Sequence, residues 1–278
     1  MKHAICVIGY GSSRVLQETI NHLDSPNIDF YIHWDKKYSL PKLQSKFSKI
    51  FLLKNRVNVH WGTYTQIQAE LNLLKAVKDS NYDYVHLISS TDIPLMTLSY
   101  FENFFKKDFY IGFQHPLGPN VYKRLSYYYP IDKLNISNKL WLIKIIKVIN
   151  ILFGVDRLKN QKERIKKGPQ WFSIKGKYIN RILSFDTSIF KNTFLCDECF
   201  IQTIFGDIDT GLSIDDNMQA ARYIKWNGRK NSPHPVTFNK NDISELKQHI
   251  NENFAFCRKV TDPEIINLLF DKKNVNKE

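Results

Sequence analysis

The stretch from His60 to Leu95 decides the fold of this chain. It reads HWGTYTQIQAELNLLKAV at residues 60–77 and NYDYVHLISSTDIPL at residues 81–95. A tight Trp61-Gly62 turn precedes apolar residues that recur every three to four positions, which predicts an amphipathic helix over about 64–78. A buried strand follows at 84–89 and stops before Asp92. Ligands bind at the carboxyl ends of strands in open α/β sheets, so Asp92 is predicted to lie at a binding site.

The same alternation continues on both sides of this stretch. Further strands are predicted at 4–8, 28–33, 51–53, 109–113 and 170–174. Further helices are predicted after the Ser12-Ser13 turn, over 197–205 and after Asp262-Pro263, with Asp242 and Glu245 forming a capping box. Alternating strands and helices indicate an α/β/α sandwich, in which helices cover both faces of a mainly parallel central sheet.

Length and composition suit a single domain with an anionic partner. The chain has 278 residues, 43% of them hydrophobic, which fits one α/β domain over 1–278. Its net charge of +13 favours nucleic acid, an acidic membrane face or a phosphorylated ligand. No recognised nucleic-acid-binding motif appears. We see no secretory signal and only four cysteines, so we expect a cytoplasmic protein with reduced thiols.

Residues 120–167 interrupt the alternation and are predicted to form a helical, basic insertion. Residues 140–153 are apolar apart from Lys144, Lys147 and Asn150. As a helix they would reach only roughly 21 Å, short of the roughly 30 Å hydrocarbon core of a bilayer. A strongly basic run follows at 157–167. We expect residues 138–167 to contact an anionic membrane surface. The alternatives are a helix packed on the rest of the domain and a dimer interface.

Two neighbouring acids, Asp197 and Glu198, begin the predicted helix at 197–205. The positive end of a helix dipole favours a carboxylate at this place. An ionised carboxylate close to a substrate hydroxyl can act as a general base. We expect Asp197 to cap the helix and to hold Glu198 in place. The other interpretation is that both acids only cap a helix.

Three further motifs are weak. Gly9-x-Gly11 lacks the third glycine of a dinucleotide fingerprint. Asp207-Ile208-Asp209 has the form of a metal-binding pair, but it follows a predicted helix rather than a central strand. Cys196 and Cys199 have the spacing of zinc ligands, but no second pair lies near them in the sequence. We therefore expect neither a metal nor another cofactor.

Five motifs in order resemble the core-2/I-branching glycosyltransferase family, which includes β-1,6-N-acetylglucosaminyltransferases and peptide xylosyltransferases. They are Trp61 with Ala69, Asp92 and Pro94; His33-x-Asp35-x-Lys37; Lys167–Phe172; Asp197-Glu198 followed by Gln202-Thr203; and Phe256–Lys259. The similarity extends over about residues 4–260. It implies a GT-A-type fold and the transfer of a sugar from a UDP-sugar to a hydroxyl of a glycan acceptor. The family's reaction inverts the anomeric carbon and uses no metal.

The resemblance also implies roles for single residues. Glu198 is expected to be the general base, with Asp197 beside it. Arg258 and Lys259 are expected to bind the diphosphate of the donor in place of a metal. Asp35 and Asp92 are expected to contact the sugar donor. Trp171 is expected to form a wall of the site. Family members use one more basic residue upstream, for which Arg222 and Arg229 are the candidates.

The substrates remain open at this stage. The resemblance favours UDP-N-acetylglucosamine as the donor, with UDP-xylose and other UDP-sugars as alternatives. A surface polysaccharide or a lipid-linked oligosaccharide is the expected acceptor. A basic nucleic-acid-binding protein and a carbohydrate-binding protein without catalysis are the alternatives of a different class.

Overall fold

A six-stranded sheet forms the centre of the protein in the computed structural model, which describes residues 1–136, 139–159, 161–226 and 235–270. The strand order is β3-β2-β1-β4-β7-β6. The strands are β1 (His3–Gly9), β2 (Ile28–Trp34), β3 (Ile50–Leu52), β4 (Tyr84–Ser89), β6 (Phe109–Tyr110) and β7 (Ser173–Lys175). The first four are parallel to one another, whereas β7 runs antiparallel to both β4 and β6. The prediction of a mainly parallel sheet is confirmed.

Successive side chains of β1 pack on opposite faces of this sheet. Ala4, Cys6 and Ile8 lie in one apolar cluster, whereas Ile5 and Val7 lie in another. This is the period of two that a strand buried on both sides must have. The central strand is therefore apolar at every position from Ala4 to Ile8.

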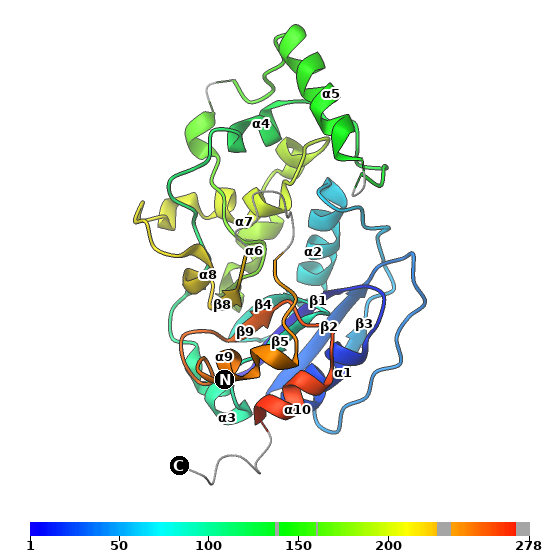
Figure 1. Ribbon diagram of the computed structural model, residues 1–278, viewed down its shortest axis with the longest axis vertical. Coiled ribbons are helices and arrows are strands. Elements are labelled where there is room, and N and C mark those ends of the chain that lie inside the picture. The colour runs from blue at the N-terminus through cyan, green and yellow to red at the C-terminus, as the bar shows by residue number, and fades with distance from the viewer. Residues whose placement is uncertain (137–138, 160, 227–234, 271–278) are drawn as a thin grey trace.

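Helices cover the two faces, as Figure 1 shows. The first cluster joins the sheet to α2 (Tyr64–Val77), α6 (Ile179–Leu183) and α7 (Asp197–Ile204). The second cluster joins it to α1 (Arg14–His22) and α3 (Leu98–Phe104). The Thr63 side chain accepts a hydrogen bond from the Thr65 N–H and so caps α2, which explains why that helix begins directly after the Trp61-Gly62 turn. The predicted α/β/α sandwich is confirmed.

A second, three-stranded sheet lies beside the main one and was not predicted. Its order is β5-β9-β8, with β5 (Asp92–Pro94), β9 (Phe256–Arg258) and β8 (Arg222–Ile224). The helices α9 (Ile243–Lys247) and α10 (Glu264–Phe270) pack against it. The short helix α8 (Asp216–Gln219) precedes β8. Strand β5 follows β4 almost at once, so the chain passes from one sheet to the other at Ser90-Thr91.

Arg222 joins the two sheets from inside the protein. Only 1% of its surface is exposed, and burial lowers the pKa of its guanidinium to about 9. Its Nη2 donates to the carbonyl oxygen of Phe172 at 2.7 Å and to that of Leu87 at 3.3 Å. A cation in this place is structural, and it is not available to a diphosphate.

The insertion at 120–167 extends from the sheet layers towards one end of the molecule's long axis (Figure 1). It contains α4 (Val121–Ser126), α5 (Leu140–Leu152) and a 3-10 turn at Lys162–Arg164. The predicted helix at 140–153 is confirmed to within one residue. None of the helices in the described ranges has the length and apolar character needed to cross a bilayer.

Three local predictions were wrong. The strand predicted over 109–113 ends at Tyr110, and the one predicted over 170–174 covers only Ser173–Lys175. The capping box is formed by Asn239 and Asp242, because Glu245 instead pairs with Tyr223 and Lys225.

Replacing Arg222 with methionine should lower the free energy of unfolding by about 2–4 kcal/mol, because buried carbonyl oxygens would lose their donor. Urea denaturation measures this change. Lys225→Met is the matched control: its ion pair with Glu245 is largely exposed, so the loss should stay below about 1 kcal/mol. Equal effects of the two substitutions would contradict a structural role for Arg222.

Candidate active site

The candidate site begins where the parallel strands end. Strands β2 and β3 lie on one side of β1 within the sheet. The chain then crosses back, so that β4 lies next to β1 on its other side and the strand order reverses there. A crevice forms at such a reversal, outside the carboxyl ends of the strands. Gly9 ends β1 and Ser89 ends β4, and the N–H of Tyr10 donates to the Oγ of Ser90 at 3.4 Å. These residues and Asp92 form the floor of the site.

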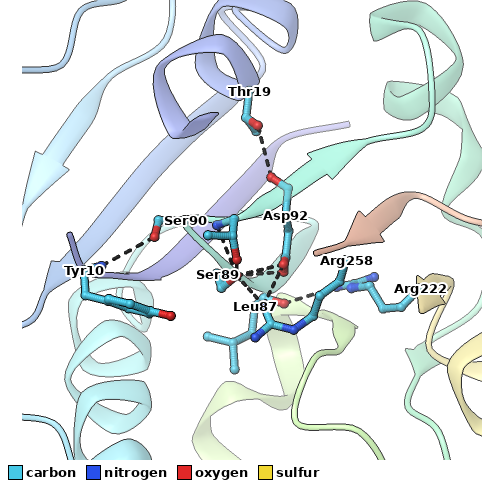
Figure 2. A network of polar contacts seen from close by, with 9 residues as sticks. Tyr10, Thr19, Leu87, Ser89, Ser90, Asp92, Arg222 and Arg258 are labelled. Atoms are coloured by element: carbon cyan, nitrogen blue, oxygen red, sulfur yellow. Dashed lines mark hydrogen bonds and ion pairs between the residues drawn. The ribbon is translucent and has the colours of Figure 1, made fainter. Parts of the chain in front are cut away.

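Asp92 holds Arg258 by an ion pair that Figure 2 shows. The Nη1 of Arg258 lies 2.7 Å from the Oδ1 of Asp92 and also donates to the Oγ of Ser89. The Asp92 carboxylate accepts two more hydrogen bonds, from the N–H and the hydroxyl of Ser89, at 2.8 and 2.7 Å. Because Asp92 is 1% exposed and Arg258 partly exposed, the arginine is the member of the pair that a ligand can reach.

Trp171 covers the other side of the arginine. The guanidinium carbon of Arg258 lies 4.3 Å from the centre of the Trp171 ring. This cation–π contact fixes the plane of the guanidinium between a carboxylate and an aromatic face. The structure therefore brings together three of the predicted site residues, Asp92, Trp171 and Arg258.

Lys259 follows Arg258 at the end of β9 and is half-buried. Its main chain is fixed by hydrogen bonds to Val236 and Phe238. Burial, and then the charge of Arg258, lowers the pKa of its ammonium group below the ordinary value. No carboxylate pairs with Lys259 within the ranges that the structure describes. Two adjacent cations, one of them without an acidic partner, favour an anion beside them.

A short segment, residues 167–171, connects this basic cluster to the predicted base. Trp171 lies on Arg258, whereas Gly168 donates its N–H to the carbonyl oxygen of Glu198 at 2.9 Å. A side chain at Gly168 is excluded, because its Cβ would lie 2.0 Å from the carbonyl oxygen of Gly112. The Gln202 amide, which donates to the carbonyl oxygen of Pro169 at 2.7 Å, secures the segment from α7. The motif at 167–172 thus sets the separation between the two clusters.

Two cations contact the carboxylate of Glu198. The Nη1 of Arg124 lies 2.6 Å from its Oε2, and the Nζ of Lys167 lies 3.5 Å from the same oxygen. Both contacts that the described residues make use Oε2, which leaves Oε1 for another group. Arg124 lies in the predicted insertion at 120–167, but the sequence did not single it out, because the contact spans 74 positions of the chain.

Asp197 does not cap α7, so this prediction was wrong. The N-cap is Cys196, and Asp197 already lies in the first helical turn. Its carboxyl group is buried, and its Oδ1 has no hydrogen-bond partner in the described part of the chain. Burial, and then the charge of Glu198, raises the pKa of Asp197 above the ordinary value.

A second buried acid, Glu70 of α2, lies behind this pair. Neither of its carboxyl oxygens has a hydrogen-bond partner among the described residues, and the neighbouring Gln170 amide nitrogen has none either. Burial raises the pKa of Glu70 well above its ordinary value of 4.5, and the charge of Asp197 raises it further. Glu198 is therefore the exposed member of a group of three acids.

Asp35 directly follows β2 and lies at the same edge of the sheet as the ends of β1 and β4. Its N–H donates to the carbonyl oxygen of Gly9 at 2.8 Å, which ties the end of β2 to that of β1. Its carboxylate accepts the Lys37 N–H at 2.9 Å and lies 3.2 Å from the Lys37 ammonium. A sugar donor that contacts the Asp35 carboxylate, as predicted, would therefore share this carboxylate with Lys37. Arg229, the other candidate for an upstream basic residue, lies outside the described residues.

The possible metal ligands of the sequence are used within the protein. Asp207 forms an ion pair with Arg181. Asp209 lies 2.8 Å from His115 and 3.0 Å from Lys166. All four cysteines are free and buried. No cluster of three or more metal-binding side chains occurs in the part of the chain that the structure describes.

The raised pKa of Glu70 predicts how stability depends on pH. The folded state keeps this proton where the unfolded chain has lost it, so the free energy of unfolding should fall as pH rises above about 4.5. Glu70→Gln removes the titration and should be more stable than the wild type by roughly 1–3 kcal/mol at about pH 8. Urea denaturation at several pH values tests this, with the exposed Glu252→Gln as the control. Equal pH dependence of wild type and Glu70→Gln would contradict the prediction.

The comparison with known proteins agrees with this geometry. No curated protein matches the chain. Residues 7–250 match the model of the family described as Core-2/I-Branching enzyme. The matched range includes Asp35, Asp92, Trp171 and Glu198, and it stops before Arg258 and Lys259. Because the match covers most of the 278 residues, the chain belongs to the Core-2/I-branching enzyme family and is a glycosyltransferase.

Proposed function

We propose that the protein transfers a sugar from a UDP-sugar to a hydroxyl of a glycan, with inversion at the anomeric carbon and without a metal. One observation carries the proposal: a carboxylate at Glu198 and a cation pair at Arg258-Lys259 lie at the two ends of the segment 167–171. A sugar nucleotide needs a base at one end of the reacting bond and positive charge at the other.

Glu198 serves as the general base. The acceptor hydroxyl donates its proton to Oε1 while the acceptor oxygen attacks the anomeric carbon from the side opposite to UDP. The bond from the anomeric carbon to the phosphate oxygen breaks, and UDP leaves with its electron pair. One direct displacement inverts the configuration. Arg124 and Lys167 hold Oε2 during this step.

Arg258 and Lys259 neutralise the diphosphate. Positive side chains aimed at the leaving group stabilise the charge that develops there. Asp92 contributes by orienting Arg258, so we assign it a positioning role rather than a direct donor contact. A metal-free reaction is supported by the position after β4, where Asp92 already pairs with Arg258. It is also supported by the occupation of Asp207 and Asp209 by basic partners.

We infer the donor and the acceptor from the chain's resemblance to the family. UDP-N-acetylglucosamine is the proposed donor, with UDP-xylose as the alternative, and Asp35 and Trp171 form the ends of the donor pocket. The acceptor is a surface polysaccharide or a lipid-linked oligosaccharide assembled in the cytoplasm. A screen of UDP-sugars for slow hydrolysis identifies the donor without knowledge of the acceptor.

Glu198→Gln should lower transfer roughly 10²–10⁴-fold, the usual contribution of a general base. UDP binding should stay close to that of the wild type, because the amide keeps the size of the side chain. Calorimetry with UDP and a turnover assay separate the two effects. The exposed Glu163→Gln is the control and should retain full activity. Activity within threefold of wild type in Glu198→Gln would remove Glu198 from the mechanism.

Transfer should persist in EDTA, and Lys259→Ala should both weaken UDP binding and slow turnover, because its ammonium replaces a metal ion at the diphosphate. Lys191→Ala, an exposed lysine, is the matched control. Complete loss of activity in EDTA with recovery on adding Mn²⁺ would show that a metal is required.

A further inference from the structure

Helix α5 presents its most apolar side to solvent. Trp141, Ile145, Val148 and Leu152 follow one another at intervals of four, three and four residues, which places them on one line along the helix. They are 58%, 48%, 55% and 76% exposed, and Phe153 directly after the helix is 78% exposed. We call these five residues the α5 stripe. Residues on such an apolar line are normally buried against the rest of the protein, whereas here they face solvent.

The opposite side of α5 is firmly attached. Ile143 and Ile146 pack in a cluster with Tyr129 and Phe194. Asn150 donates from its amide to the carbonyl oxygen of Tyr128 at 3.0 Å and accepts from the Tyr128 N–H at 2.8 Å. A buried amide that pairs with both main-chain groups of one residue fixes the rotation of the helix. The α5 stripe is therefore held outward by the fold.

Positive charge surrounds the α5 stripe. Residues 133–155 include Lys133, Lys139, Lys144 and Lys147 and contain no aspartate or glutamate. The first three are exposed, and two more exposed basic side chains, Arg157 and Lys159, follow shortly after the helix, next to the exposed Asp156. A second copy of this chain would bring like charges together around the contact, which disfavours self-association. An anionic surface with an apolar interior matches both the stripe and its surroundings.

We propose that the α5 stripe docks the protein on an anionic lipid bilayer. From Trp141 to Leu152 the stripe covers 12 residues and a rise of about 17 Å, and it lies in the plane of the interface with its side chains below the headgroups. Each basic residue near the surface adds to the attraction, which screening by salt weakens. Figure 1 shows α5 at one end of the long axis, away from both sheets, so a flat surface can reach it without obstruction.

The docked helix is connected to the candidate site. The cluster that holds α5 includes Phe194 and, partly buried, Leu195, which immediately precede the helix of Glu198. The neighbouring helix α4 carries Arg124, which contacts Glu198. Under the proposed function, this arrangement assigns the acceptor to the membrane surface, as a lipid-linked glycan. Docking itself does not depend on the chemistry of transfer.

Flotation with vesicles of phosphatidylcholine containing phosphatidylglycerol tests the proposal. The wild type should float with these vesicles at low salt, remain behind with pure phosphatidylcholine and be released at high salt. The double substitution of Ile145 and Val148 by glutamate should lower the bound fraction at least roughly tenfold, because it places charge on the apolar line. Phe47→Glu, at an exposed aromatic residue elsewhere, should leave binding unchanged.

Two further measurements separate docking from its alternatives. Trp141→Phe should bind vesicles as the wild type does but lose the blue shift of tryptophan fluorescence that accompanies binding. The Ile145/Val148 double variant should hydrolyse UDP-sugars at the wild-type rate and keep its circular dichroism spectrum, which shows that it folds. Failure of the wild type to float would overturn the proposal. So would a dimer in light scattering that the double substitution dissociates, since the stripe would then be a contact between copies.

Discussion

The ion pair between Asp92 and Arg258 is the contact on which the arrangement of the site depends. Asp92 begins β5 and Arg258 ends β9, and the two are also register partners in the second sheet. The pair thus fixes the second sheet at the place where the first sheet ends. Its attraction is strong because Asp92 is buried and three donors satisfy its carboxylate. Removing either partner would leave an unpaired charge at the boundary between the sheets.

Charge of both signs is distributed unevenly around the site. The cations Arg124, Lys167, Arg258 and Lys259 are partly exposed, whereas the acids Glu70 and Asp197 are buried. Burial raises the pKa of both interior acids, so they need not add negative charge to the candidate site. Four partly exposed basic side chains therefore accompany a single partly exposed carboxylate, that of Glu198. The net charge of +13 has the same sign as these basic side chains and would attract the anionic donor.

Sequence reasoning predicted the elements with a strong period and missed those without one. The strands at 3–9, 28–34 and 84–89 and the helix at 64–77 agree with the prediction to within one or two residues, because each buries a continuous apolar face. Strands β5, β8 and β9 have three residues each, too few for any alternation to show. The start of α7 at Asp197 agrees with the prediction, but its N-cap is Cys196 rather than Asp197, which a pattern of side-chain types does not reveal.

The residues of the site divide in the same way, into those that stand in a sequence motif and those that do not. Glu198, Arg258 and Trp171 stand in motifs, and the resemblance identified them as a set. Arg124 and Glu70 do not, since their importance comes from contacts across 74 positions and from a buried place without a partner. Arg222 shows the opposite outcome. The sequence made it a candidate for a ligand-binding basic residue, but the fold buries it between the two sheets. Burial and pairing are properties of the folded chain, and they decide which of 40 basic residues can meet a ligand.

The two halves of the site belong to different parts of the architecture, which bears on how such an enzyme can change its substrates. Arg258, Asp92 and Trp171 lie at the ends of sheet strands or beside them, where any displacement would disturb the core. Arg124 lies on α4, in the insertion that also carries α5 and that contacts the sheet layers mainly through α7 and the loop before it. The segment 167–171 joins these halves, and it packs so closely on Gly112 that Gly168 has no room for a side chain. Under the proposed function, a change in the insertion would therefore alter the acceptor side of the site, whereas the donor side depends on the two sheets.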